Sequence, residues 1–285
     1  MFSDYLALTK PRITWLILMS TAVGFYFGLP QLNPGNFTLV LLHLVVGTGL
    51  IASGTAALNQ WWEREGDKFM TRTATRPLPS GKIKAERALI FGIVLAALGF
   101  GELWIGCNPL TAGLGLFTLV TYLFVYTPLK RRSPHSTTIG AIPGAMPPLI
   151  GYAAAAGVLT WEAWALYLIL FVWQFPHFYA IAWMYRDEYK KAGILMLPVV
   201  EPDGNSTANR ILWTSILLAP TSLLPVALAM SGRVYLGAAI LMGAMLLYTA
   251  FKFFGERTTE RARGVLLASV VYLPVLYAVL IFAPR

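Results

Sequence analysis

Three oxygen-bearing side chains are spaced four residues apart where a long apolar stretch meets a charged one. Asn59, Glu63 and Asp67 stand in the run LNQWWEREGD, within a chain of 285 residues that is 57% hydrophobic and only 12% charged. At 3.6 residues per turn this spacing predicts one polar stripe along the end of a helix. Carboxylates at a helix C-terminus oppose the negative end of the dipole, so we expect a cation to compensate them. Oxygen ligands favour a hard divalent cation such as Mg²⁺.

Two arginines follow the stripe directly. Arg72 and Arg76 carry planar donor groups that suit phosphate oxygens. An elongated apolar molecule carrying a diphosphate would fit this pattern, with its tail between apolar helices and its head group against Mg²⁺ and the arginines. Metal and arginine would neutralise the charge that develops as an allylic carbon–oxygen bond breaks.

Hydropathy defines the class of protein that presents this stripe. The mean hydropathy is +0.63, and many apolar runs are long enough to cross a bilayer as helices. We predict an all-α polytopic membrane protein, with one domain over residues 1–285 and nine transmembrane helices around a central cavity that opens at the cytoplasmic side. The predicted spans are 13–29, 38–58, 88–106, 110–127, 139–157, 163–185, 211–230, 234–251 and 265–283.

Basic residues are distributed unevenly between the connections. Those before the first span and in alternate loops predict a cytoplasmic N-terminus, cytoplasmic large loops and a C-terminus outside. Arg233 and Arg285 are the exceptions. This distribution and attraction to anionic membrane lipid account for the net charge of +9, so nucleic acid is not expected as a partner. The start MFSDYLALTKPR leads directly into the first span without a cleavable signal, which favours a prokaryotic plasma membrane.

A second candidate group lies at the end of the sixth span. His177 and Glu188 are eleven residues apart, close to three helical turns, which predicts that they share one helix face. Glu188 is then a further candidate metal ligand, and its alternative role is a solvated helix end. An ionisable ring in an apolar segment favours a cavity or a polar partner, so His177 is either a site residue or a packed interface residue.

Several motifs resemble those of the UbiA-type intramembrane prenyltransferases. The run from Asn59 to Pro79 resembles the first signature of that superfamily. The likeness extends over nearly the whole chain, and the Pro-His-Phe segment narrows it to the branch that modifies haem. The further matching segments are LTKPR at 8–12, YTPLKRR at 126–132, GAIPGAMPPLIGYAAAAG at 140–157, WQFPHFYAIA at 173–182 and AGILMLP at 192–198.

The resemblance implies a reaction and a role for each site residue. Farnesyl diphosphate would ionise, the 2-vinyl group of haem b would be alkylated, and water would supply the hydroxyl of the product. The implied Mg²⁺-binding and catalytic residues are Asn59, Glu63, Asp67 and Glu188. The implied substrate-binding residues are Arg72, Arg76, Lys130, Arg131 and His177, the last beside the haem. The resemblance leaves open whether a haem A synthase or an oxidase assembly factor receives the product.

Two positions depart from the pattern of this branch. Glu188 stands where Asp is usual, and Ser136 stands where Asn is common. Both keep oxygen donors, but the longer Glu188 side chain changes the expected metal geometry. Quinone-forming relatives carry a second Asp-rich motif in this region.

Other classes of protein remain open from the sequence. A sister enzyme would prenylate an aromatic quinone precursor instead of haem. A secondary transporter could use broken helices, which the IPGAMPPLIG segment at 142–151 would permit. Transporters place polar residues deep in the bilayer, whereas the charges here are predicted at the rim. The acidic stripe beside paired arginines argues against a purely structural protein.

Overall fold

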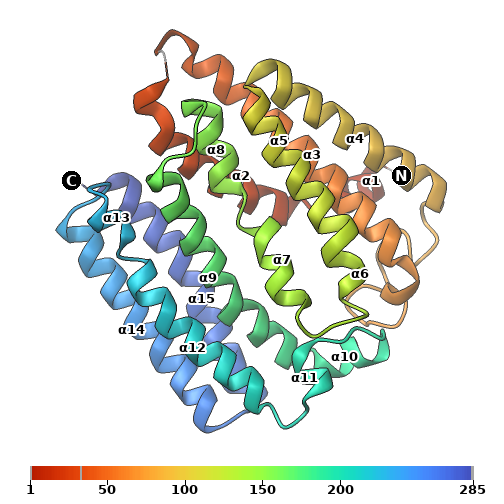
Figure 1. The fold of residues 1–285 in the computed structure, drawn as a ribbon. Helices are drawn as coiled ribbons and strands as arrows, with labels where there is room; N and C mark the ends of the chain where they lie inside the picture. The colour runs from red at the N-terminus through yellow and green to blue at the C-terminus, as the bar shows by residue number, and fades with distance from the viewer. Residues whose placement is uncertain (1, 33, 284–285) are drawn as a thin grey trace.

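The computed structural model describes residues 2–32 and 34–283, and every regular element within them is a helix (Figure 1). Arg285 lies outside these residues. The first half contains α1 (Phe2–Leu8), α2 (Pro11–Gly28), η1 (Leu29–Gln31), η2 (Pro34–Asn36), α3 (Phe37–Asp67), α4 (Ala85–Gly106), α5 (Pro109–Val120), η3 (Thr121–Tyr126) and α6 (Thr127–Leu129). The second half contains α7 (Ser136–Gly144), α8 (Pro147–Ala156), α9 (Trp161–Met184), α10 (Arg186–Lys191), α11 (Leu197–Val200), α12 (Asn205–Thr221), α13 (Leu224–Ala227), α14 (Arg233–Gly255) and α15 (Thr259–Phe282).

The helical architecture confirms a polytopic membrane protein. Within the described residues, nine helical segments are long and apolar enough to cross a bilayer. The second segment is longer than its apolar run, because α3 continues into the charged sequence as far as Asp67. This extension places the predicted polar stripe on the last turns of a regular helix. The seventh segment likewise begins earlier than predicted, at Asn205.

Two predicted spans are not regular α-helices throughout. The fifth is divided into α7 and α8 at Ala145 and Met146, because the two consecutive prolines that begin α8 have no N–H to donate the helical hydrogen bonds that would join the two segments. The fourth changes from α5 to η3, which is a π-helical turn. Such turns are frequent at functional sites, and η3 carries Tyr122 and Tyr126, which both line the pocket described below.

The fifth and sixth spans form the centre of the bundle. The share of residues buried is 72% for the fifth span and 67% for the sixth, against 28–44% for the others. Figure 1 shows α8 and α9 in the middle of the molecule, with α4 and α14 on opposite outer edges. The outer helices instead leave large apolar side chains exposed, as lipid-facing surfaces require.

Small residues allow α2 and α8 to approach closely. A Cβ added at Gly151 would lie 1.8 Å from the backbone oxygen of Thr21, and one at Gly24 would lie 1.9 Å from the backbone oxygen of Pro148. The two backbones are therefore in direct contact, a packing mode common between membrane helices. This contact fixes the position of α8 and, through it, the centre of the bundle.

The charged connections gather at one end of the bundle. The loop after α3, the end of α6 and the short helices α10 and α11 lie together there, and α15 ends at the opposite side (Figure 1). All the residues that sequence analysis assigned to the Mg²⁺ and phosphate site belong to these elements or to the adjoining end of α3.

Candidate functional site

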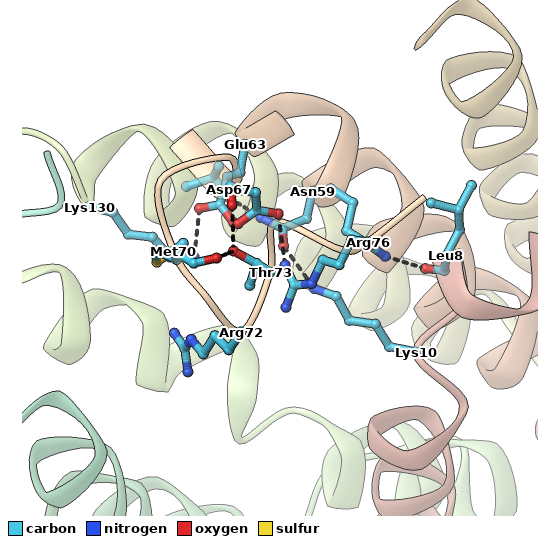
Figure 2. Close-up of polar contacts among 12 residues, drawn as sticks. Leu8, Lys10, Asn59, Glu63, Asp67, Met70, Arg72, Thr73, Arg76 and Lys130 are labelled. Carbon is cyan, nitrogen blue, oxygen red and sulfur yellow. Dashed lines mark hydrogen bonds and ion pairs between the residues drawn. The ribbon is translucent and has the colours of Figure 1, made fainter. Parts of the chain in front are cut away.

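The polar stripe of α3 faces a pocket with a cavity volume of about 120 Å³. Asn59, Glu63 and Asp67 all line it, and Figure 2 shows their side chains along the same end of the helix. Asn59 is 1% exposed and Asp67 is 2% exposed. Burial of amide and carboxylate groups is costly unless they are partnered, so each should have a specific polar neighbour.

Each member of the stripe is paired with a cationic side chain. Glu63 Oε1 accepts a hydrogen bond from Lys130 Nζ at 2.8 Å, and Asp67 Oδ2 accepts one from Arg76 Nη1 at 2.8 Å. Asn59 Oδ1 accepts one from the third cation, the Nζ of Lys10, at 3.1 Å. In Figure 2 Lys130 and Lys10 approach the stripe from opposite sides. The pocket therefore alternates oxygen acceptors with positive charge.

The π-helical turn supports one edge of this arrangement. Asn59 Nδ2 donates to Thr127 Oγ1 at 3.3 Å, and that hydroxyl donates to the backbone oxygen of Tyr122 at 2.8 Å. The Nζ of Lys130 lies 4.5 Å from the centroid of the Tyr126 ring, which stabilises it by a cation–π contact. The amide of Asn59 and the ammonium of Lys130 are thus both held in place by the fourth span.

The two partly buried lysines have different electrostatic environments. Burial and then the nearby charge of Arg76 lower the pKa of Lys10 to about 8. Burial also acts to lower the pKa of Lys130, but the negative charge of Glu63 outweighs it and holds this pKa well above its usual value. Lys130 therefore stays charged at neutral pH, as its pairing with Glu63 requires.

The last predicted phosphate ligands lie on the neighbouring loops. Arg72 lines the same pocket as the stripe and donates from Nη2 to Tyr189 Oη at 2.7 Å. Arg131 lines an adjoining pocket with a cavity volume of about 90 Å³, which shares Glu63 and Asp67 with the first. Four of the five predicted substrate-binding residues thus surround the two carboxylates.

A small apolar cluster joins the loop after α3 to the segment around α10. Its members, called the loop cluster below, are Met70, Ala182, Tyr189, Ala192, Ile194 and Met196. The amide of Leu195 also donates to the backbone oxygen of Lys130 at 2.8 Å. Three connections that are far apart in the sequence therefore meet over the pocket.

His177 and Glu188 are placed elsewhere. The expectation that they share one helix face is wrong, because α9 ends at Met184 and α10 begins at Arg186, with the non-helical Tyr185 between them. Neither residue lines either of the two pockets, and Tyr189 is the residue of α10 that does. Glu188 Oε2 is buried without a hydrogen-bond partner among the described residues.

The surroundings of His177 are aromatic and only weakly polar. Its Nδ1 lies 2.9 Å from Ser269 Oγ on α15, and its ring stacks on Trp173 with centroids 4.7 Å apart. These contacts satisfy the packed-interface alternative, and they also leave Nε2 as the nitrogen with which the ring could bind a further group.

Sequence reasoning missed several residues of the pocket, among them Lys10, Tyr122 and Tyr189. Lys10 was assigned only to membrane orientation, although its left-handed backbone (φ 47°) between α1 and α2 directs it to Asn59. The LTKPR motif was the available signal, because Lys10 is its central residue and the motif is among the segments that resemble the prenyltransferase pattern. Tyr189 stood next to Glu188 in the same charged run, and no pattern distinguished the two.

The donor set of the pocket fits a hard divalent cation. Amide and carboxylate oxygens from Asn59, Glu63 and Asp67 are the ligand types that Mg²⁺ prefers. Among the described residues no three acidic, histidine or cysteine side chains converge to hold a metal alone. Mg²⁺ commonly completes its shell with waters and substrate phosphates, so this set is typical of a metal bound together with a diphosphate.

Comparison with known proteins finds matches that extend over nearly the whole chain. The profile of the UbiA prenyltransferase family matches residues 17–277. A protein named protoheme IX farnesyltransferase from Solibacter usitatus is 61% identical over 98% of this chain and 97% of its own length. A protein of the same name from Koribacter versatilis is 47% identical over 97% of this chain and 92% of its own length.

Solved structures show the same fold at low sequence identity. Digeranylgeranylglyceryl phosphate synthase superposes with a TM-score of 0.81 at 19% identity, over 98% of this chain and 97% of its own. A UbiA homologue from Archaeoglobus fulgidus bound to GPP and Mg²⁺ gives a TM-score of 0.63 at 17% identity, over 97% and 99%. That homologue holds a prenyl diphosphate together with a divalent metal.

Proposed function

Because this chain belongs to the UbiA prenyltransferase family, we propose that it transfers a farnesyl group from farnesyl diphosphate to the 2-vinyl group of protohaem IX. It is an intramembrane transferase. The observation that supports the proposal most is the pocket in which Asn59, Glu63 and Asp67 face Arg72, Arg76 and Lys130. Near-full-length relatives that carry the name protoheme IX farnesyltransferase support the choice of acceptor.

The reaction that this pocket would support is balanced as follows. The bond between C1 of the farnesyl group and the diphosphate oxygen breaks, and pyrophosphate leaves with the electron pair. The vinyl group of haem b attacks C1, and water adds to the resulting cation with loss of a proton. The products are pyrophosphate and haem carrying a hydroxyethylfarnesyl group, with no change in oxidation state that needs an external reductant.

The side chains of the pocket would divide the work on the diphosphate. Arg72 and Arg76 would bind phosphate oxygens, and Lys130, which lies 2.8 Å from Glu63, would move onto the head group when it arrives. Mg²⁺, when bound, would neutralise charge on the leaving group. Binding of the anion would draw Arg76 and Lys130 from their carboxylates, and those oxygens would then be available to hold the cation.

We place this site at the cytoplasmic side of the cell membrane. The basic residues of the loop after α3 and of the segment around α10 support this orientation by the positive-inside rule. Aromatic rings near the pocket, among them Tyr122 and Tyr126, would stabilise an allylic cation and help to exclude water.

A product assay tests the proposed reaction. Purified protein incubated with haem b, farnesyl diphosphate and Mg²⁺ is expected to yield a product heavier than haem by one farnesyl group and one hydroxyl group, detected by mass spectrometry. Excess chelator is expected to abolish that product, because without the cation the negative carboxylates would repel the anionic leaving group. Prenylation of a hydroxybenzoate with haem left unchanged would assign the protein to quinone synthesis instead, and full activity in chelator would refute the metal site.

A further expected result concerns the haem. We propose that His177 Nε2 binds the haem iron, with Nδ1 held by Ser269 at 2.9 Å, as the second nitrogen of metal-binding histidines usually is. His177→Ala should then weaken haem binding by roughly 10-fold or more, measured by titrating the haem absorption band. Its KM for farnesyl diphosphate should stay unchanged.

The exposed His135 offers the matched control, since His135→Ala removes a histidine outside both pockets. An unaltered absorption band and haem affinity in His177→Ala would leave His177 with its packing role only.

A further inference from the structure

Arg72 and Arg76 are held in the pocket by different kinds of partner. Arg76 donates to the carboxylate of Asp67 at 2.8 Å, so its charge is balanced within the protein. Arg72 forms no ion pair with a carboxylate among the described residues. Its Nη2 donates to the neutral hydroxyl of Tyr189 at 2.7 Å. The guanidinium of Arg72 is therefore held in position by a hydrogen bond, but no carboxylate among the described residues neutralises its positive charge.

Two tyrosine rings hold the guanidinium of Arg72 from the segment around α10. Its Cζ lies 5.0 Å from the centroid of the Tyr185 ring and 4.9 Å from that of Tyr189. Arginine stacks on aromatic faces without giving up its charge. Tyr189 is itself 8% exposed and packs in the loop cluster, so its hydroxyl is a fixed acceptor.

This support matters because Arg72 is otherwise exposed and lies on a loop. A free arginine loses considerable side-chain entropy when it binds an anion, and a preorganised guanidinium has already lost much of it. One donor is used by Tyr189, and the remaining N–H groups of the guanidinium are available to phosphate oxygens.

We propose that Tyr189, assisted by Tyr185, is a positioning residue that presents Arg72 to the diphosphate of the prenyl substrate. The inference rests on the proposed function, because it requires that a prenyl diphosphate binds this pocket. Tyr189 touches no reacting atom and acts only through Arg72. This positioning role agrees with the pocket lining, to which the segment around α10 contributes Tyr189 and no acidic residue.

Tyr189→Phe is the decisive variant, because it removes the hydroxyl and keeps the ring in the loop cluster. Since hydrogen bonds to charged groups are among the stronger ones, we expect the KM and the dissociation constant for farnesyl diphosphate to rise roughly 10-fold. The KM for haem b should stay at the wild-type value. Tyr189→Leu, which also removes the cation–π contact, should have the larger effect of the two.

A double-mutant cycle separates positioning from general structural support. Equilibrium binding of radiolabelled farnesyl diphosphate is measured for wild type, Tyr189→Phe, Arg72→Ala and the double variant. If Tyr189 acts through Arg72, the hydroxyl deletion should cost nothing further once Arg72 is alanine. Tyr235→Phe is the matched control, since it deletes a buried hydroxyl that donates to Ser222 O at 2.9 Å, remote from the pocket.

The outcomes distinguish this inference from the function on which it rests. Wild-type protein that neither binds farnesyl diphosphate nor transfers the farnesyl group would refute the proposed function. Wild-type activity together with an unchanged affinity in Tyr189→Phe would refute the positioning role alone. An equal loss of affinity from Tyr189→Phe with and without Arg72 would also refute it, since the hydroxyl would then act independently of the arginine.

Discussion

Asp67→Asn is expected to lower kcat for farnesyl transfer by roughly 10³-fold, the loss typical when a preorganised electrostatic contact is removed from an active site. Asparagine keeps the volume of the side chain and an oxygen that can accept from Arg76, but it removes the negative charge needed beside a divalent cation. Steady-state rates at saturating farnesyl diphosphate, haem b and Mg²⁺ measure the effect.

Glu65 provides a control on the same turn of α3. Its side chain is 65% exposed and pairs with Lys68 at 2.8 Å, so Glu65→Gln removes a carboxylate close in sequence but outside the pocket. We expect wild-type rates from this variant. Comparable losses in both variants would mean that the net charge of the loop matters, and not a specific ligand.

At position 67, asparagine is a better test substitution than alanine. The sequence predicts the charges at the rim of the bundle, but Asp67 is only 2% exposed and pairs with Arg76. Alanine would leave the guanidinium of Arg76 without its partner and would cost about 1–3 kcal/mol of stability. A loss of activity in Asp67→Ala would thus mix a chemical effect with a structural one.

Gly151→Ala is expected to lower the stability of the folded protein strongly. Its added Cβ would lie 1.8 Å from the backbone oxygen of Thr21, and backbone cannot rotate away as a flexible side chain can. Helices α2 and α8 must separate, which should lower the free energy of unfolding by about 3 kcal/mol or more. Thermal unfolding in detergent, followed by circular dichroism, should show a clearly lower Tm.

Gly237→Ala on α14 is the matched substitution. A Cβ there would meet no heavy atom within 4 Å, so the Tm should stay the same or rise slightly through better helix propensity. Equal Tm values for Gly151→Ala and Gly237→Ala would contradict the close contact between α2 and α8.

The membrane fold could be predicted because its signal is local. Two features are visible without knowing any tertiary contact: apolar runs long enough to cross a bilayer as helices, and an uneven distribution of basic residues. The polar stripe of α3 was predictable for the same reason, since Asn59, Glu63 and Asp67 are related by helix geometry alone. The breaks in the helices were harder to predict from the sequence, although the prolines at 147 and 148 indicated one of them.

Contacts between distant segments could not be read from the sequence. Lys10 reaches Asn59, and Arg72 reaches Tyr189, across separations of 49 and 117 residues. The error on His177 and Glu188 arose differently, because helix periodicity was extended across Tyr185, where the helix ends. Periodicity predicts a shared face only while one helix continues, and the sequence gives no strong signal of this interruption: no glycine or proline lies between Phe178 and Ala192.

The loop cluster has a mechanical consequence. Met70 and Tyr189 are in one apolar contact group, and Lys130 is hydrogen-bonded to Leu195, so the three connections over the pocket cannot shift independently. Separating the loop after α3 from the segment around α10 would expose apolar surface on both, and moving the end of α6 would break the hydrogen bond between Leu195 and Lys130. A charged head group that enters by displacing these connections would therefore have to move them together. A mutation that loosens the packing of Met70 would also loosen Tyr189.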